Sequence, residues 1–299
     1  MENNKQPLVS VVIACYNHEH FVQDCIQSVI DQTYENIELI IIDDGSKDGS
    51  VEKIQEMIFA CERRFKRFEF RYRPNKGLSR TLNEALVWCE GEYYSPFASD
   101  DIMCANKIEI QANFLIQNSD SSIAGVFGGY YLIDESNKTI KTIVKKEKKY
   151  HFDEIFLHNF SLPAPTALLI LENVRSIGGY KENLKIEDWY MWLKLTENHK
   201  SLVYLNTVLV KYRSHDINFS KNFKIMNEER KKVIDCFSHS NKYNMARLKV
   251  EWLKATDYLY VDKTQSIVYL LKLLKCDIKQ IVTMSFVKYF FHAFKSFIK

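Results

Sequence analysis

Two adjacent carboxylates, Asp100 and Asp101, close a strand-like apolar segment in the stretch YYSPFASDDI, residues Tyr93–Ile102. Neighbouring carboxylates repel each other unless water screens them or a cation lies between them. Carboxylate oxygens are hard ligands, which suit Mg²⁺ and Mn²⁺. The same acids could instead cap the following helix, a role that Asp101 would fill before IMCANKIEI. The pair taken alone leaves both interpretations open.

Three other predicted strands also end in acidic or polar residues. In a parallel sheet the carboxyl ends of the strands meet at one edge, where ligands bind. Four polar strand ends at one edge favour a ligand site over four unrelated turns. They are Tyr16 and Asn17, Asp43 and Asp44, Asn75 to Gly77, and Asp100 and Asp101. The sequence has no GxxxxGK(S/T) loop, and no GxGxxG follows the first strand, so a metal ion would have to neutralise a bound diphosphate.

The elements that must position these residues follow from hydrophobic periodicity. Short β-branched runs at Leu8–Asn17 and in IELIIIDDGS predict buried strands, with an apolar stripe of helical spacing between them. Strand and helix alternate three times at intervals of roughly 30 residues, which predicts βαβ units with right-handed crossovers. The stretch DGSVEKIQEMIFACERRF, residues 48–65, predicts one helix, and LPAPTALLI, residues Leu162–Ile170, predicts a strand with a proline-marked entry. Residues 122–145 read as antiparallel strands joined by a turn at Glu135–Lys138, and the chain is helical from about Phe223. We therefore expect an α/β fold with a mostly parallel sheet, a small antiparallel element and a C-terminal helical region.

Two further groups of polar residues lie outside the alternating part of the chain. Glu187 and Asp188 precede the helical segment WYMWLKL. Either acid could simply place a negative charge at the helix N-terminus. The stretch KYRSHD places Arg213 and His215 directly after a predicted strand, where a lone histidine is usually structural.

Three stretches occur in a characteristic order and spacing. They are SVVIACYNHEHFVQDCIQSVIDQTYENIELIIIDDGSKDGS, NKGLSRTLNEAL followed by GEYYSPFASDD, and EDWYMWLKL. In these stretches the chain resembles family 2 glycosyltransferases of the GT-A fold, from about Leu8 to His215. Many members carry an acid where this chain has Ala98, which gives a DxD motif. Here the motif is reduced to Ser99-Asp100-Asp101, a pattern that also occurs in the family.

The resemblance implies that the chain binds a UDP-sugar. Tyr16 would lay its ring against the nucleobase, in a pocket also lined by Ala14. Asp43 would accept a hydrogen bond from N3–H of uracil, which favours uracil over cytosine, and Asp100 would hold the ribose. Arg213 could pair with the diphosphate. The other residues expected at the nucleotide sugar are Asn17, Asp44, Asn75 and Arg80.

The resemblance also implies roles at the reacting end of the donor. Asp101 would bind Mn²⁺ or Mg²⁺, and His215 could complete the metal shell through a neutral imidazole. Asp188 would be the general base that removes the proton of the acceptor hydroxyl. Glu187 would orient the acceptor, and Trp189 could be either a platform for its sugar ring or a core residue. One displacement would invert the anomeric configuration.

The implied function is transfer of a sugar from a UDP-sugar to a hydroxyl of a glycan acceptor, with a lipid-linked acceptor of bacterial polysaccharide, lipopolysaccharide or glycoconjugate synthesis as the leading expectation. Residues 1–220 would form the GT-A catalytic domain, with a nucleotide-binding half at about 1–102 and an acceptor half at about 103–220. Residues 221–299 would form the helical region. Two alternatives stay open. A sugar-1-phosphate nucleotidyltransferase should carry a glycine-rich loop where this chain has CYNHEHF, and loss of the base or of the metal acid would favour a non-catalytic GT-A binding module.

Composition bears on partners and location. The net charge of +3 is too small to favour nucleic acid as a partner. Seven cysteines without a CxxC pair predict reduced thiols in a cytoplasmic protein. The N-terminal MENNKQPLVS lacks the basic and apolar regions of a secretory signal, and no apolar run reaches the roughly 18 residues of a membrane-spanning helix.

The C-terminal segment Met284–Lys299 separates an aromatic face from a basic edge if it is helical. Such a helix can lie in a membrane interface with its lysines on anionic head groups. It could also pack on the catalytic domain or on a second subunit of a homodimer. We expect peripheral contact with the inner face of the cytoplasmic membrane through this helix.

Overall fold

The structure is a computed structural model of the 299-residue chain, and it describes residues 6–118, 120–215, 222–276 and 283–298. The chain forms two compact units. Unit 1 comprises Met1–Phe152, Phe160–Asn183 and Glu187–His215, and unit 2 comprises Asp153–Asn159, Leu184–Ile186 and Asp216–Lys299. Both residues at the predicted domain boundary, 220 and 221, lie outside the described residues.

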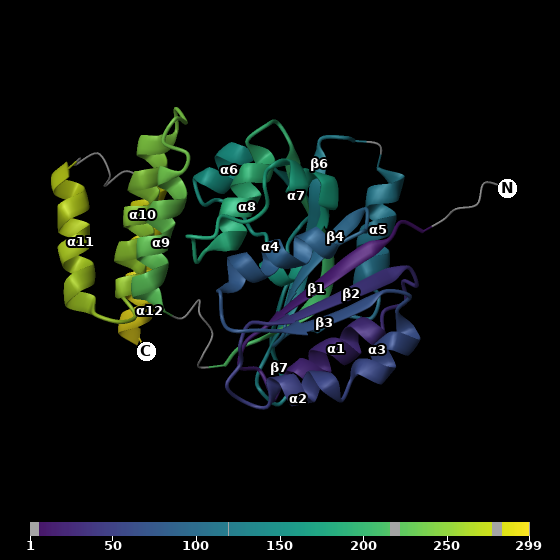
Figure 1. Ribbon diagram of the computed structural model, residues 1–299. Coiled ribbons are helices and arrows are strands. Elements are labelled where there is room, and N and C mark those ends of the chain that lie inside the picture. Colours follow the sequence, from purple (N-terminus) through teal and green to yellow (C-terminus); the bar gives the residue numbers. More distant parts are fainter. Residues whose placement is uncertain (1–5, 119, 216–221, 277–282, 299) are drawn as a thin grey trace. The chain divides into compact units, whose positions relative to one another are not determined.

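Unit 1 is built on one mixed sheet with the strand order β3-β2-β1-β4-β9-β6-β10-β5, in which β7 also pairs with β6 and β8 with β10 (Figure 1). Four pairs are parallel: β1 with β2, β1 with β4, β2 with β3, and β6 with β10. The strands are β1 (Val9–Cys15), β2 (Ile37–Asp43), β3 (Phe68–Tyr72), β4 (Tyr93–Ala98), β5 (Ile102–Met103), β6 (Ile123–Ile133), β7 (Thr139–Ile143), β8 (Lys148–Tyr150), β9 (Leu168–Ile170) and β10 (Ser201–Arg213).

The two strands β1 and β2 lie inside the sheet, and their side chains are buried almost throughout. Burial on both faces explains why these strands are near-continuous runs of valine and isoleucine. Apolar residues of α1, α3 and α5 share one core with β1 and β2. The helices of unit 1 are α1 (Val22–Ile30), α2 (Ser50–Gln55), α3 (Ile58–Arg64), α4 (Leu78–Trp88), α5 (Lys107–Gln117), α7 (Leu171–Ser176) and α8 (Glu187–Thr196), with a 3₁₀ turn at Ala164–Thr166. The short helix α6 (Phe152–Phe156) belongs, apart from Phe152, to unit 2.

The fold class expected from the sequence is confirmed, and the antiparallel hairpin of β6 and β7 lies where the turn at Glu135–Lys138 was predicted. Two elements differ from expectation. The single helix predicted across residues 48–65 is interrupted between α2 and α3. The strand predicted from Leu162 to Ile170 is reduced to β9, because Pro163 and Pro165 have no N–H to give to a strand ladder and the chain turns there instead.

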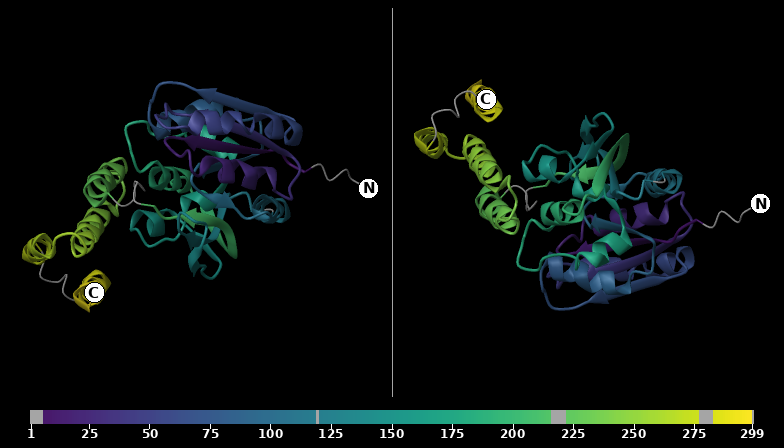
Figure 2. Two further views of the ribbon diagram at one scale, coloured as in Figure 1. Left: turned by 90° about the horizontal axis from the view of Figure 1, so that it is seen from below. Right: turned by 90° about the horizontal axis from the view of Figure 1, so that it is seen from above.

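Unit 2 contains four long helices, α9 (Phe223–Asp235), α10 (Tyr243–Tyr258), α11 (Lys263–Cys276) and α12 (Met284–Ile298). Figure 2 shows them end-on, in green to yellow. Trp252 and Leu259 of α10, Leu270 and Leu273 of α11 and Tyr289 of α12 form a core of their own. In the described part of the chain, no helix combines the length and the apolar character needed to cross a membrane.

Candidate active site

Strand pairing brings three loops of unit 1 together. The parallel strands β1 and β4 are in register at Ala14 and Ala98, so the segments that follow them start at the same edge of the sheet. The antiparallel pair of β10 and β5 matches Lys211 with Ile102, which carries the end of β10 back to the turn after β4. His18 follows β1, Asp100 lies in the turn between β4 and β5, and His215 follows β10.

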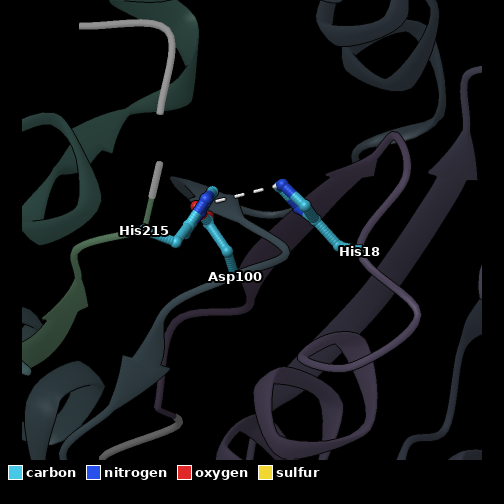
Figure 3. A group of neighbouring side chains, drawn as sticks. All are labelled: His18, Asp100 and His215. Carbon is cyan, nitrogen blue, oxygen red and sulfur yellow. Dashed lines mark hydrogen bonds and ion pairs between the residues drawn. The ribbon is translucent and has the colours of Figure 1, made fainter. Parts of the chain in front are cut away.

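His18, Asp100 and His215 converge in a small cluster (Figure 3). One ligand atom from each residue lies within 4.8 Å of the other two. His215 Nε2 is 2.8 Å from Asp100 Oδ2, and His18 Nε2 is 4.0 Å from the same oxygen. Two imidazole nitrogens and one carboxylate oxygen are a donor set that fits a divalent cation such as Mn²⁺. Among the described residues, no other group of three or more such side chains is arranged to hold a metal.

Electrostatics distinguish the two adjacent acids. Burial opposes ionisation of Asp100, but the hydrogen bond from His215 and the nearby His18 outweigh it and lower the pKa of Asp100. Burial, and then the charge of Asp100, raise the pKa of Asp101 well above its usual range. Burial lowers the pKa of His18, which keeps its ring neutral at neutral pH and able to bind a metal.

Asp101, the residue after Asp100, is fully buried. Its Oδ1 accepts a hydrogen bond from the backbone N–H of Arg213, at 2.8 Å, and its Oδ2 has no hydrogen-bond partner among the described residues. The Arg213 guanidinium is also buried and donates to the carbonyl oxygens of Asp100, Asp134 and Glu135. The structure therefore places Asp100, rather than the predicted Asp101, beside His215. The predicted contact of Arg213 with a diphosphate stays a prediction, and its observed contacts hold the turn that carries Asp100.

The two acids that end β2 order their own loops. Asp43 accepts hydrogen bonds from Gly45 N and Ser46 N, at 3.0 and 2.8 Å, and from the Ser46 hydroxyl. Asp44 accepts from Lys76 N and Gly77 N, each at 2.8 Å, and pairs with Arg73. Asp44 thus joins the end of β2 to the loop before α4. Neither set of contacts excludes the predicted binding of a nucleotide, because each carboxylate oxygen can accept more than one hydrogen bond.

The remaining residues predicted at the donor are more dispersed. Tyr16 is 46% exposed and directly follows β1, where its ring can meet a planar ligand. Asn17 is tied to the loop after β2, with its N–H on Ser46 Oγ and its Oδ1 accepting from Lys47 N. Asn75 is exposed in the loop before α4. Arg80 is exposed on α4 and pairs with Glu182, at 2.8 Å.

Glu187 and Asp188 form the first turn of α8. Asp188 Oδ1 accepts from Trp189 N at 2.6 Å, so the helix N-terminus stabilises its charged form. Burial, and then the charge of Asp188, raise the pKa of Glu187 to about 8. Burial also raises the pKa of Asp188. The pair therefore tends to keep its proton on Glu187 and its charge on Asp188, an arrangement that suits Asp188 as a base.

The loop before α8 is fixed to α4. Asn83 donates from Nδ2 to Tyr180 O and accepts at Oδ1 from Tyr180 N, both at 2.8 Å. Gly179 has φ 72°, and a Cβ there would meet Asn83 Oδ1 at 2.6 Å, so only glycine fits. The side chain of Trp189 is 3% exposed, which favours its core alternative over a sugar platform.

Replacing Glu187 by Gln is expected to make thermal stability less dependent on pH. The folded-state pKa of Glu187 is about 8, above its ordinary value of 4.5, so folding favours the protonated acid. The stability that this provides is present below about pH 4.5 and is lost as the pH rises through about 8. Glutamine mimics the protonated form and removes that loss. Between about pH 5 and about pH 9, the melting temperature should fall more for the wild type than for the variant. Parallel plots of melting temperature against pH for the two proteins would contradict the raised pKa of Glu187.

Three residues near the cluster were missed from the sequence. His18 supplies the second imidazole of the cluster, Ser99 is hydrogen-bonded to His18 Nδ1 at 2.7 Å, and Phe21 stacks on His215. The only sequence signal for them was their place after the first strand and before Asp100, in loops already expected at the ligand edge.

Comparison with known proteins identifies the family. The family model described as "Glycosyl transferase family 2" matches residues 10–174, more than half of the chain. A relative from Escherichia coli, "UDP-Glc:alpha-D-GlcNAc-diphosphoundecaprenol beta-1,3-glucosyltransferase WfgD", is 31% identical over 218 residues, which cover 72% of this chain and 80% of that protein. The chain belongs to glycosyl transferase family 2, and the resemblance inferred from its motifs is confirmed.

Other similarities agree with this placement. "Uncharacterized glycosyltransferase RT0329" of Rickettsia typhi is 31% identical over 226 residues, which cover 72% of this chain. The chain spans 66% of that relative's length and 42% of a relative from Rickettsia felis. The solved mannosyltransferase PcManGT from Pyrobaculum calidifontis, in complex with GDP-Man and Mn²⁺, has a TM-score of 0.64 at 12% identity, covering 98% of this chain and 81% of its own. That likeness shows the shared fold.

Proposed function

We propose that the chain transfers a sugar from a UDP-sugar to a hydroxyl of a lipid-linked glycan acceptor, with inversion at the anomeric carbon, in bacterial polysaccharide, lipopolysaccharide or glycoconjugate synthesis. The observation that carries the proposal is the similarity to the E. coli relative over 80% of its length. The name of that relative specifies UDP-Glc, a diphosphoundecaprenol-linked GlcNAc and a β-1,3 product. Because UDP-glucose is an α-glycoside, a β product requires inversion.

On the donor side, the nucleotide would lie across the loops that follow β1, β2 and β4. Tyr16 offers an exposed ring to the uracil, and Asp43 is the acceptor for its N3–H. His18, Asp100 and His215 would hold Mn²⁺ or Mg²⁺. When bound, the ion supplies positive charge for the leaving diphosphate. The backbone of the Asp100 turn is held in place by Arg213, so the carboxylate needs little rearrangement to engage the donor.

On the acceptor side, Asp188 would remove the proton of the attacking hydroxyl. The acceptor hydroxyl oxygen then attacks the anomeric carbon from the face opposite to the leaving UDP, and one displacement completes the transfer. The hydrogen bond from Trp189 N at the start of α8 favours the ionised form of Asp188 against the effect of burial, and the proton on Glu187 would give that side chain a hydrogen-bond donor for an acceptor oxygen. A base of this kind contributes typically ~10²–10⁴-fold.

A screen of UDP-sugars for hydrolysis to UDP, with and without Mn²⁺, tests the donor. We expect at least one UDP-sugar to release UDP in a reaction that Mn²⁺ stimulates. Release of diphosphate from UTP and a sugar 1-phosphate would identify a nucleotidyltransferase instead. Tight binding of UDP-sugars without turnover on any acceptor would identify a binding module.

We also propose that the chain meets its acceptor from the cytoplasmic side, by peripheral contact of α12 with the membrane. The residues of α12 that face α10 and α11 are Phe286, Tyr289 and Ala293. The neighbouring face of α12 is apolar yet exposed, with Val287, Phe290, Phe291 and Phe294 at 56, 50, 58 and 68% exposure. Phe297 and Ile298, part of the predicted apolar face, have side chains outside the described residues, as does Lys299.

Charge favours a bilayer as the partner of this face. Neither α11 nor α12 contains an acidic residue, and five lysines occur on them. Lys288 and Lys295 are exposed at one edge of the α12 aromatic face. Exposed aromatics beside lysines suit an interface of acyl chains and anionic head groups. Each lysine near such a surface adds about 1 kcal/mol, reduced by salt.

Replacing Phe290, Phe291 and Phe294 together by serine is expected to release the protein from anionic liposomes without changing UDP-sugar hydrolysis. All three rings are at least 50% exposed, so their loss removes apolar membrane contact, and only Phe290 of the three also packs on Phe286 and Tyr289, at ring-centroid distances of 4.6 and 5.7 Å. Sedimentation with phosphatidylglycerol vesicles measures the effect. Met245→Ser, at another exposed apolar residue on α10, is the matched control and should still bind. If the full chain never sediments with vesicles, or if the triple variant instead converts a dimer to a monomer, the face binds a second copy and the membrane proposal is wrong.

A further inference from the structure

The backbone of the loop that carries His18 is held by hydrogen bonds to the loop after β2. His18 N donates to Ser50 Oγ at 2.9 Å, and Asn17 N donates to Ser46 Oγ at 2.8 Å. Asn17 adopts φ 55°, a left-handed conformation that asparagine tolerates better than most other non-glycine residues. The loops after β1 and β2 therefore form one frame, and His18 projects from it.

The imidazole rings are fixed as well. His18 Nδ1 is hydrogen-bonded to Ser99 Oγ at 2.7 Å, which leaves Nε2 on the side of Asp100. An outer partner of this kind sets the tautomer and the ring orientation of a metal-binding histidine. Phe21 stacks on His215 with ring centroids 5.3 Å apart and meets His18 edge-on at 6.2 Å. The Arg213 guanidinium lies over the Phe21 ring, 4.6 Å from the ring centroid.

We propose that His18 is a metal ligand, and that the set of two imidazoles and one carboxylate binds Mn²⁺ in preference to Mg²⁺ and without a nucleotide. The inference rests on the proposed function in one respect, namely that the bound metal takes part in donor binding. A site with a single carboxylate would depend on phosphate oxygens of the donor to hold the ion. Here three protein donor atoms already lie within 4.8 Å of one another.

The chemistry of the donor atoms supports this selectivity. Mg²⁺ favours oxygen ligands in near-ideal octahedral geometry and gives up its water reluctantly. Imidazole nitrogen suits first-row transition-metal ions better than it suits Mg²⁺. Among these ions, affinity for such a site rises from Mn²⁺ through Fe²⁺ to Co²⁺. Because the rings are held by Ser99 and Phe21, little conformational freedom is lost when the ion binds. Co²⁺ should bind as well and report imidazole ligation by its visible absorption.

The test is titration of the full-length, EDTA-stripped chain with MnCl₂ and with MgCl₂ in the absence of nucleotide, by calorimetry and by Mn²⁺ electron paramagnetic resonance. We expect one Mn²⁺ per chain, bound at least about tenfold more tightly than Mg²⁺. His18→Ala should weaken Mn²⁺ binding at least about tenfold, because loss of even a residue that only orients a metal ligand typically costs about 10- to 100-fold in affinity. His20→Ala is the matched control, because His20 lies in the same loop with an 80% exposed side chain, and it should bind like the wild type.

Phe21 provides a second variant that separates ligation from folding. Phe21→Trp keeps an aromatic ring beside His215 and should retain binding, whereas Phe21→Leu should weaken binding and change the Co²⁺ spectrum. Wild-type affinity in His18→Ala, equal affinities for Mg²⁺ and Mn²⁺, or Mn²⁺ binding only when UDP is present would each overturn the inference. UDP-sugar turnover is measured on the same samples to keep the two proposals apart. Turnover by the wild type, together with unchanged Mn²⁺ affinity in His18→Ala, would refute the proposed metal ligand and leave the proposed function standing.

Discussion

Replacing Asp188 by asparagine is expected to lower kcat by about 10²-fold or more while leaving UDP-sugar binding intact, because it removes a general base without touching the donor loops. Asp188 is the acid of its pair whose charge is supported by the N-terminus of α8. Asparagine keeps the size of the side chain and an oxygen for the Trp189 N–H, so the helix should begin at the same place. Transfer kinetics and a separate UDP-sugar binding titration give the two readouts.

Glu187→Gln is the matched control for this prediction. Glu187 holds a proton at neutral pH because its pKa is about 8, and glutamine preserves a donor in the same place. The variant should retain most of the activity. An inactive Glu187→Gln enzyme beside an active Asp188→Asn enzyme would show that the base is the other carboxylate.

Removing the carboxylate of Asp100 should lower transfer at least about 10²-fold, the loss expected when a group that stabilises developing charge is deleted. Asp100 is the acid that contacts both histidines of the cluster. EDTA should inactivate the wild type to a similar extent, and added Mn²⁺ should restore the wild type but not Asp100→Ala. Full activity in EDTA would remove the metal from the mechanism.

Asp101→Asn distinguishes the two neighbouring acids. The amide oxygen can still accept the hydrogen bond of Arg213 N, so the turn should keep its shape and most of the activity should survive. If Asp101→Asn is inactive and Asp100→Ala is active, the ligand is Asp101, as the sequence motif first indicated.

The parts of the fold that follow from local patterning were predictable. The strands β1 to β4 are short and separated by helices, with β-branched residues in β1 and β2 and aromatic residues in β3 and β4, and their carboxyl ends fall on the polar residues that the sequence singled out. The general position of the site follows from that alternation alone. Which side chain at each strand end turns toward the ligand does not follow from it.

Asp100 and Asp101 show the limit most clearly. Both acids are buried, and the pairing of β10 with β5 decides which one faces the two histidines, because it places Arg213 N against Asp101. That pairing joins segments more than a hundred residues apart. His18 was missed for a similar reason: its bonds to Ser50 and Ser99 depend on loops that are distant in the sequence. Trp189 belongs to a segment with apolar residues on all sides, so periodicity could not assign it to core or surface.

The stereochemistry of the product is the most direct test of inverting transfer from a UDP-sugar to a lipid-linked acceptor. The chain should be incubated with Mn²⁺, the UDP-sugar that it hydrolyses best and a synthetic GlcNAc-diphosphopolyprenol acceptor, and the new glycosidic bond should be analysed by proton NMR. For an α-configured UDP-sugar the account predicts a β-linked product together with one equivalent of UDP. An α-linked product, or formation of UTP and a sugar 1-phosphate without a new glycosidic bond when diphosphate is added, would contradict it.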